Sequence, residues 1–123
     1  MNVTITVSGE KAKVVGISSV IYEMIYNLMD NAVKYNKEGG SVTVRITPTP
    51  RPTITVSDTG IGIPTEHLPR IFERFYRVDK SHSRAIGGTG LGLSIVKHAA
   101  AYHNAEISIK SELGKGTSVT VEF

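Results

Sequence analysis

Apolar and polar residues alternate in five short stretches of the chain, and a period of two residues predicts β-strands. The first stretch starts near Val3, ends at Gly9 and is expected to be half-buried. Prolines at positions 48, 50 and 52 predict a turn between the second and third strands. The predicted strands lie at residues 3–8, 42–46, 54–57, 107–109 and 119–123.

A different period appears between residues 19 and 33, where apolar residues recur in adjacent pairs every fourth position. This spacing predicts a helix that packs one face against a hydrophobic core. Either Ser18 or Ser19 is expected to cap the start of the helix, and Gly39 lies beyond its end.

Two further helices and a loop complete the predicted elements. Residues 64–77 predict a helix with Pro64 in its first turn, residues 79–90 predict a glycine-rich loop, and residues 91–102 predict the last helix. The order β-α-ββ-α-loop-α-ββ predicts a single α+β domain over residues 1–123. We expect a two-layer α/β sandwich in which three helices cover one face of a mainly antiparallel, five-stranded sheet.

Composition excludes several classes of protein. The chain has no cysteine, which excludes a disulfide framework and thiolate metal sites. It has no run of 18 apolar residues and no visible secretory leader, so we expect a cytoplasmic domain without membrane contact. A net charge of +3 suits a phosphate-bearing ligand but is too small to indicate a nucleic-acid partner.

Glu23, Asn27 and Asn31 are spaced four residues apart and therefore form one file on the first predicted helix. Asparagine is a poor helix former, about 0.6 kcal/mol less favourable than alanine per position. Its amide oxygen is a hard, neutral ligand that suits Mg²⁺ carrying substrate phosphates. Taken alone, the file fits either a metal site or an ordinary solvated helix face.

The sequence DTGIGIP follows the third predicted strand and begins with Asp58. A carboxylate at a strand end can accept a hydrogen bond from the exocyclic amine of a base. Gly60 and Gly62 would let the backbone pass close to a flat ring, because glycine has no side chain. The same residues also suit an ordinary turn.

The sequence GGTGLG, at residues 87–92, runs directly into the last predicted helix. Backbone N–H groups at a helix start attract anions, and the helix dipole adds to this attraction. The run matches neither the Walker loop nor the dinucleotide-binding fingerprint, and a flexible linker is the alternative interpretation. Before it, FERFYRVD at residues 72–79 offers aromatic anchors, and Arg77 is better placed than Arg70 to contact a phosphate.

Together these segments resemble the GHKL nucleotide-binding superfamily and, within it, the sensor histidine kinases. Five family boxes occur in order and cover nearly the whole chain. The segment from Arg77 to His98 is most similar to phosphate-responsive sensor kinases. The boxes are NLMDNAVKY at 27–35, DTGIGIP at 58–64, FERFYRVD at 72–79, GGTGLGL at 87–93 and GKGT at 114–117.

The resemblance implies the Bergerat ATP-binding fold, with ATP held between helices beneath a lid at residues 78–90. It implies that Asn31 ligates Mg²⁺ with Asn27 beside the metal, and that Asp58 binds the adenine amino group. Asn27, Asn31, Lys34 and Arg77 are the implied catalytic residues. The residues implied to bind ATP are Asn27, Asn31, Lys34, Tyr35, Asp58, Gly60, Gly62, Ile63, Arg77, Gly88, Thr89, Gly90, Leu91, Gly92, Leu93 and Thr117.

Position 27 distinguishes a kinase from a hydrolase. Superfamily ATPases such as gyrase carry a glutamate there that activates water as a general base, and Asn27 cannot accept a proton. The resemblance therefore implies phosphoryl transfer from Mg-ATP to a histidine. Alternatives are a GHKL-type ATPase and an anti-sigma-type serine kinase or binding module.

The phosphoacceptor histidine is expected outside this chain. In the family it lies on a helical dimerisation domain and is followed by an acidic residue, a context that none of the four histidines here shares. The resemblance thus implies a monomeric fragment that binds ATP without phosphorylating itself. Its implied partners are that dimerisation domain and a response regulator, within a full-length protein anchored in the cell membrane.

Overall fold

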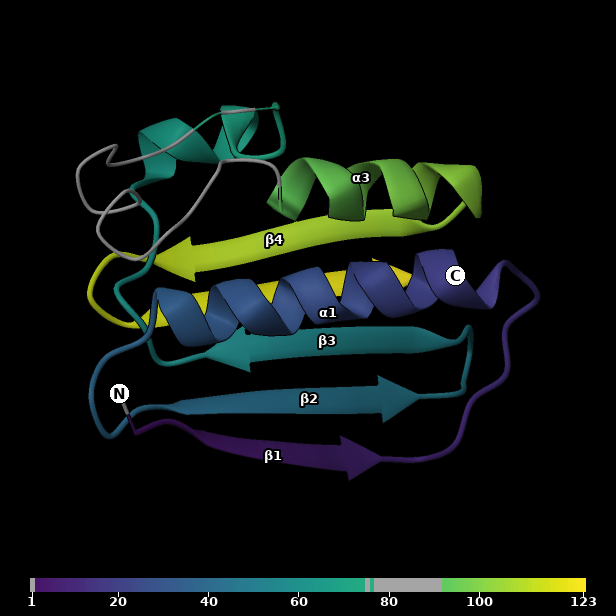
Figure 1. The fold of residues 1–123 in the computed structure, drawn as a ribbon, viewed down its shortest axis with the longest axis horizontal. Coiled ribbons are helices and arrows are strands. Elements are labelled where there is room, and N and C mark those ends of the chain that lie inside the picture. The colour runs from purple at the N-terminus through teal and green to yellow at the C-terminus, as the bar shows by residue number, and fades with distance from the viewer. Residues whose placement is uncertain (1, 75, 77–91) are drawn as a thin grey trace.

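Five strands form one mixed sheet in the spatial order β1-β2-β3-β5-β4 (Figure 1). β1 and β2 run parallel, and every other neighbouring pair is antiparallel. The computed structural model describes residues 2–74, 76 and 92–123. The elements are β1 (Thr4–Gly9), α1 (Ser18–Lys34), β2 (Ser41–Thr47), β3 (Thr53–Asp58), η1 (Thr65–Arg70), α3 (Gly92–Tyr102), β4 (Glu106–Glu112) and β5 (Gly116–Glu122).

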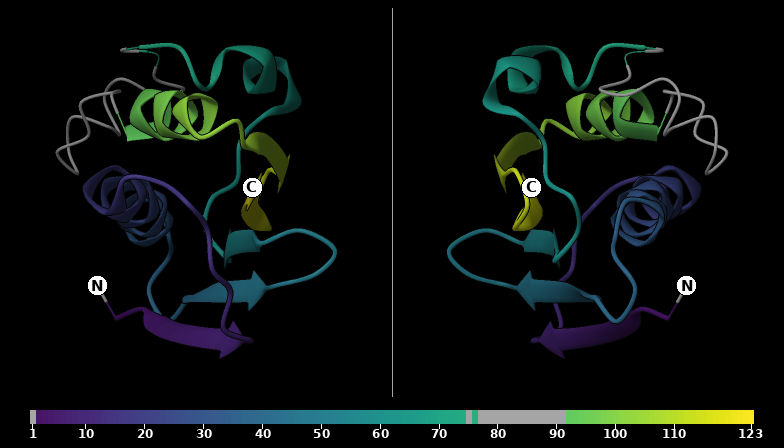
Figure 2. Two further views of the ribbon diagram at one scale, coloured as in Figure 1. Left: turned by 90° about the vertical axis from the view of Figure 1, so that its right-hand side faces the viewer. Right: turned by 90° about the vertical axis from the view of Figure 1, so that its left-hand side faces the viewer.

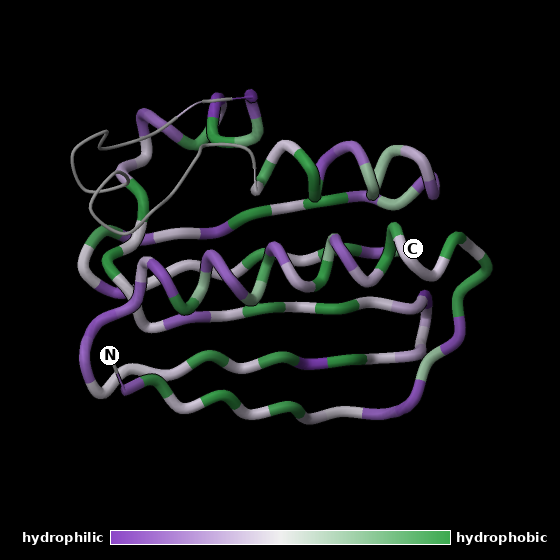
Figure 3. The backbone as a smooth tube through the Cα atoms, in the orientation of Figure 1, coloured by the Kyte–Doolittle hydropathy of each residue, from purple (hydrophilic) through white to green (hydrophobic). Residues whose placement is uncertain are grey.

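The helices α1 and α3 contact each other and lie side by side on one face of the sheet (Figure 2). The core fills the space between these two layers, and the alternating hydropathy of the strands is visible in Figure 3. Four core side chains are almost completely removed from water, and each of the layers contributes to this set. They are Met24, Val42, Val96 and Val121. The predicted two-layer α+β fold is therefore confirmed.

The first strand is more exposed than its sequence pattern predicts. All six residues of β1 are exposed, including Ile5 at 47% and Val7 at 63%. α1 packs on β2 and β3, and β1 lies at the sheet edge on the far side of β2 (Figure 1). The prediction of a half-buried strand was wrong because alternation reveals which residues share a face, whereas burial depends on what covers that face.

The predicted second helix is also different in the structure. Thr65–Arg70 forms a short 3₁₀-helix, and Pro64 immediately precedes it instead of occupying its first turn. Pro69 lies inside this segment. Proline has no N–H to donate and its ring clashes with the carbonyl four residues earlier, so an α-helix is disfavoured here. Over the described residues of 64–77, the predicted helix was therefore wrong, because only Thr65–Arg70 is helical and it forms a 3₁₀-helix.

The start of α1 has no serine cap. Ile17 occupies the cap position and no side chain caps the helix, while Ser18 and Ser19 already lie within it. The N–H of Ile17 instead donates to Nε2 of His103, at 3.1 Å, near the end of α3. The prediction of a serine cap was therefore wrong, and the N–H of the residue at the cap position is bonded to a residue far away in the sequence.

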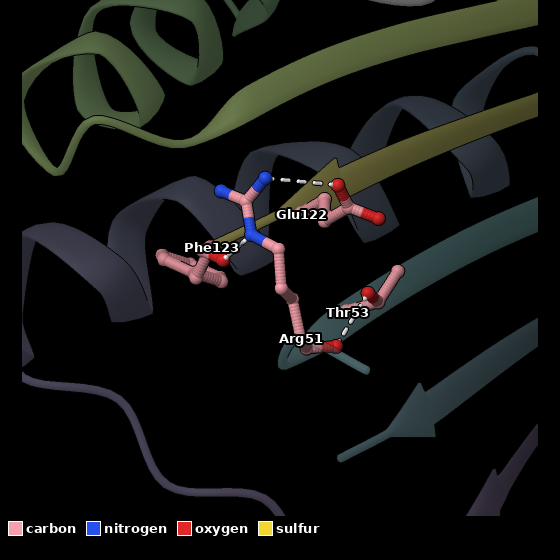
Figure 4. Close-up of polar contacts among 4 residues, drawn as sticks. All are labelled: Arg51, Thr53, Glu122 and Phe123. Carbon is pink, nitrogen blue, oxygen red and sulfur yellow. Dashed lines mark hydrogen bonds and ion pairs between the residues drawn. The ribbon is translucent and has the colours of Figure 1, made fainter. Parts of the chain in front are cut away.

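The β2–β3 turn is tied to the end of β5 by Arg51 (Figure 4). Its Nε donates to the carbonyl oxygen of Phe123 at 2.6 Å, and its Nη1 lies 3.1 Å from Glu122 Oε1. The hydroxyl of Thr53 donates to the Arg51 carbonyl at 2.9 Å. Because Arg51 is exposed, we expect its ion pair to contribute less than about 1 kcal/mol to stability.

Candidate functional site

Asp58 ends β3 on the same face as the core residues Ile54 and Val56, because side chains alternate along a strand. Its Oδ1 accepts two backbone hydrogen bonds, from Gly60 at 2.8 Å and from Thr117 at 3.2 Å. Within the part of the chain that the structure describes, Oδ2 accepts none. The carboxylate therefore keeps one oxygen atom, Oδ2, to accept a hydrogen bond from a ligand.

Burial raises the pKa of Asp58 above its ordinary value, and the hydrogen bonds from Gly60 and Thr117 lower it only in part. The charged carboxylate is therefore incompletely compensated in the folded protein. A donor that bonds to Oδ2 would replace some of the lost hydration. This is the electrostatic situation expected at a binding site and not in a region optimised for stability.

The loop after Asp58 is held between the end of α1 and the β4–β5 hairpin. The N–H of Ile61 donates to the Tyr35 carbonyl at 3.0 Å, and the N–H of Gly114 donates to the Ile61 carbonyl at 2.8 Å. A Cβ atom on Gly60 would lie 2.2 Å from the Tyr35 oxygen. A Cβ on Gly62 would lie 2.2 Å from the backbone oxygen of Glu112. Both positions therefore require glycine, because the backbone of another segment lies too close to leave room for a Cβ atom.

Gly62→Ala should destabilise the protein by about 3 kcal/mol or more, because a φ of +75° is strained for alanine and the new Cβ meets backbone. Gly39→Ala is the matched control, since Gly39 has a φ of +77° but open space around it. We expect the control to lose only about 1 kcal/mol. Urea unfolding measures both variants, and equal losses would contradict close packing at Gly62.

Asn27 and Asn31, the asparagines predicted to form the metal site, lie beside the start of α3. A Cβ on Gly92 would lie 3.2 and 3.3 Å from the two amide atoms of Asn31, and 3.5 Å from Oδ1 of Asn27. Nδ2 of Asn27 donates to the Glu23 carbonyl at 2.8 Å, which directs its oxygen away from that carbonyl. The two amides therefore line a half-buried surface beside the helix start, where backbone N–H groups can attract an anion.

The remaining described candidates lie around the end of α1. Lys34 pairs with Asp30 at 3.0 Å, and both side chains are about one-third exposed. Tyr35 is the cap residue of α1 and contacts the Asp58 loop through its carbonyl. Ile63 donates its N–H to Oγ of Ser111, and Leu93 packs on the core. The structure therefore gathers these residues at one end of the molecule.

Five predicted site residues lie outside the described part of the chain: Arg77, Gly88, Thr89, Gly90 and Leu91. Arg70, the other arginine considered, is exposed and pairs with Glu73 at 3.1 Å. Its guanidinium also lies 4.8 Å from the ring centre of Tyr76. For Arg70 the structure favours the interpretation as a surface charge over a role at the phosphates.

Sequence reasoning missed three polar residues that support the site. Asn36 is only 7% exposed; its Nδ2 donates to the Ser41 carbonyl at 2.9 Å, and its Oδ1 accepts from Lys37. The Thr59 hydroxyl accepts the Ser41 N–H at 2.9 Å. Ser111 bonds to three groups around the Asp58 loop. Of the three, Ser111 could have been found from the sequence, because it is a polar residue at a core-facing position of β4.

Amide oxygens are the metal donors that this site offers. Across residues 2–74, 76 and 92–123, no group of three or more His, Cys, Asp and Glu side chains is arranged to hold a metal ion. Asn27 and Asn31 fit a cation that receives its remaining ligands from phosphates and water. None of the helices in the described part of the chain has the length and apolar character needed to cross a bilayer.

The sequence has clear relatives among known proteins. The profile of the family described as "Histidine kinase-, DNA gyrase B-, and HSP90-like ATPase" matches residues 16–123. Sensor histidine kinase YkoH of Bacillus subtilis is 48% identical over 84% of this chain and 22% of its own length. The phosphate regulon sensor protein PhoR of Pseudomonas aeruginosa is 48% identical over 79% of this chain and 22% of its own. The chain therefore spans less than a third of these relatives.

Solved structures agree with this similarity. The solved chain of the mycobacterial sensor histidine kinase MprB superposes with a TM-score of 0.87 at 30% identity, and the match covers 98% of this chain and 82% of that solved chain. Full-length ShkA in complex with AMPPNP superposes with a TM-score of 0.78 at 29% identity, covering 98% of this chain and 24% of ShkA.

Proposed function

Because the chain belongs to the family of histidine kinase-, DNA gyrase B- and HSP90-like ATPases, we propose that it binds Mg-ATP as the catalytic domain of a sensor histidine kinase. In this role it transfers the γ-phosphoryl group to a histidine on a separate dimerisation domain. The similarity to YkoH and PhoR supports the kinase assignment, and the similarity to ShkA, solved with AMPPNP, supports nucleotide binding.

The main support is the arrangement of two complementary surfaces at the same end of the molecule. Asp58 offers a carboxylate oxygen to a base, and Gly92 brings the start of α3 to the Asn31 amide. The Tyr35 carbonyl, one turn after Asn31, contacts the loop that follows Asp58. A nucleotide can therefore place its base at Asp58 and its phosphates at α3.

A bound Mg²⁺ would neutralise phosphate charge as the terminal phosphoryl group departs. Asn31 would hold the ion, and Asn27 would lie beside it. Lys34, the last residue of α1, would approach the phosphates, although Asp30 pairs with it here. These residues act by position and charge, which are the main contributions a protein makes to phosphoryl transfer.

Position 27 favours a kinase over a hydrolase. The side chain of Asn27 cannot act as a general base. Glu23, one turn earlier, lines an apolar groove with Ile17 and Tyr102 near the opposite end of α1. No carboxylate on this file therefore lies beside the Asn31 amide to activate water. The site would hold ATP until a histidine arrives.

The activity is tested by mixing the chain with a purified dimerisation domain and ATP labelled at the γ position. We expect phosphohistidine on the added domain, with hydrolysis by the chain alone remaining near background. Steady hydrolysis without phosphohistidine would favour the ATPase alternative. Phosphoserine on a partner would favour the anti-sigma-type kinase instead.

Asn27→Glu should raise hydrolysis by about tenfold or more, because a carboxylate at this position can act as a general base. Asn27→Gln is the matched control: it has the same length but cannot accept a proton, and we expect no increase. Phosphate release measured at saturating ATP distinguishes the two variants. An equal increase in both would show that the effect arises from size alone.

The other partners follow from the same proposal. We propose that the chain is monomeric, that a response regulator receives the phosphoryl group from the dimerisation domain, and that the full-length protein is anchored in the membrane. The similarity to the phosphate regulon sensor protein PhoR supports a sensor protein as the full-length context of this chain. Sedimentation of the isolated chain tests the first of these statements.

A further inference from the structure

Ser111, on β4, lies at the centre of a hydrogen-bonded group beside Asp58. Its Oγ accepts the N–H of Ile63 at 2.7 Å and lies 3.0 Å from the carbonyl oxygen of Gly116. It is also 2.7 Å from Oγ1 of Thr117, its register partner on β5. The backbone of Thr117 donates to Asp58, so this group is directly connected to the candidate base-binding carboxylate.

The chemistry of a hydroxyl determines the direction of these bonds. Ser111 has one proton and two lone pairs, and a carbonyl oxygen can only accept. Its proton must therefore point to Gly116, since otherwise two oxygen atoms with facing lone pairs would lie 3.0 Å apart. The contact with Thr117 is then a bond in which Thr117 donates, and both lone pairs of Ser111 are occupied.

This direction leaves only acceptors beside the base. The Thr117 hydroxyl has used its proton on Ser111, so it can only accept from a ligand. The ionised Asp58 also can only accept, through Oδ2. At position 6, a purine with an amino group can donate to such an edge, whereas a purine with an oxo group brings another acceptor.

We propose that Ser111 is a positioning residue that determines purine specificity by orienting the hydroxyl proton of Thr117. The proposal rests on the function proposed above, in which the base lies at Asp58. Removing the Ser111 hydroxyl frees the Thr117 proton to turn toward the ligand and donate to a 6-oxo group. Rejection of 6-oxo purines then weakens, because the edge is no longer composed of acceptors alone.

The test compares binding of Mg-ATP and Mg-ITP by calorimetry, since the base of ITP differs from adenine only in its 6-oxo group and N1 proton. We expect wild-type protein to prefer ATP and Ser111→Ala to reduce the ratio of the two Kd values about tenfold. Ser111→Thr keeps the hydroxyl and should keep the ratio. If the role of Ser111 is merely structural, Ser111→Ala would weaken the binding of both nucleotides equally and leave the ratio of their Kd values unchanged. That result would overturn the proposal.

A Thr117→Val background shows whether Ser111 acts through Thr117. There, Ser111→Ala should cause no further change in the ratio, and a full tenfold change would contradict the proposal. If Ser111→Ala does not fold, NMR of the wild-type chain provides the second test. The Thr117 hydroxyl proton should exchange slowly with water and show a nuclear Overhauser effect to the Ser111 β protons. If that hydroxyl signal is absent, the proposed direction of the hydrogen bond is rejected. Failure of wild-type protein to bind either nucleotide would instead refute the function itself.

Discussion

Asn31→Ala is expected to weaken Mg-ATP binding about a hundredfold, or about 2.7 kcal/mol, without lowering the stability of the folded chain. The amide of Asn31 lies against the start of α3, where the proposed metal and phosphates would be held. Alanine supplies no oxygen ligand, so the metal loses a donor. Alanine also favours helix more than asparagine does, by about 0.6 kcal/mol, so stability should stay equal or increase.

Calorimetry measures this loss, and EDTA identifies its cause. If Asn31 acts through Mg²⁺, chelation should weaken nucleotide binding to wild-type protein but have little effect on the variant. Tyr22→Ala is a suitable control, because Tyr22 is 73% exposed on the same helix. Unchanged affinity in Asn31→Ala would contradict the metal role, and equal losses in the two variants would indicate a general effect on α1.

Asp58→Asn should weaken ATP binding about a hundredfold and bring GTP affinity close to that of ATP. The amide oxygen can still accept the N–H groups of Gly60 and Thr117, as Oδ1 does now. The NH₂ group then replaces Oδ2 and donates to the ligand. A donor repels the amino group of adenine but bonds to the 6-oxo group of guanine.

The same substitution should affect stability in the opposite direction. Burial raises the folded-state pKa of Asp58 above 3.8, so the folded protein binds more protons than the unfolded chain in the pH range between the two values. Stability contributed by Asp58 is therefore present at low pH and is lost as pH rises through the folded pKa. Asp58→Asn removes this loss, and at neutral pH it should be at least as stable as wild type.

Thermal unfolding at several pH values checks the sign. The difference in unfolding free energy should shift in favour of Asp58→Asn as pH rises above 3.8. Glu66→Gln makes the same change of charge at an exposed position and is expected to affect neither stability nor nucleotide preference. If the difference in unfolding free energy instead shifts in favour of wild type as pH rises, Asp58 stabilises the fold as a charged group. That result would contradict a binding role.

Most of the fold could be predicted because periodicity is a local property. Alternation along Val42, Val44 and Ile46 predicted β2, and the paired apolar residues after Ser19 predicted α1. The four-residue spacing of Asn27 and Asn31 placed both amides on one file, where the structure finds them beside Gly92. Such features depend only on the geometry of a single helix or strand.

Features that depend on distant partners could not be predicted in this way. The alternation in β1 indicates a common face for Ile5 and Val7 but not that α1 fails to cover it. The N–H of Ile17 is satisfied by His103, 86 positions away, and no local pattern announces that bond. The 3₁₀-helix before Ile71 could have been anticipated from Pro69, whose effect is local.

By itself, the sequence determined the strands, the two α-helices, the fold class and the family, because each depends on residue types at short or ordered spacing. Only the tertiary structure decided which groups meet: β1 beside β2 in parallel, the start of α3 against Asn31, and Ser111 against Thr117. The physical reason is that hydrogen-bond direction, desolvation and exposure are properties of a neighbourhood. That neighbourhood exists only after segments far apart in the chain have packed together.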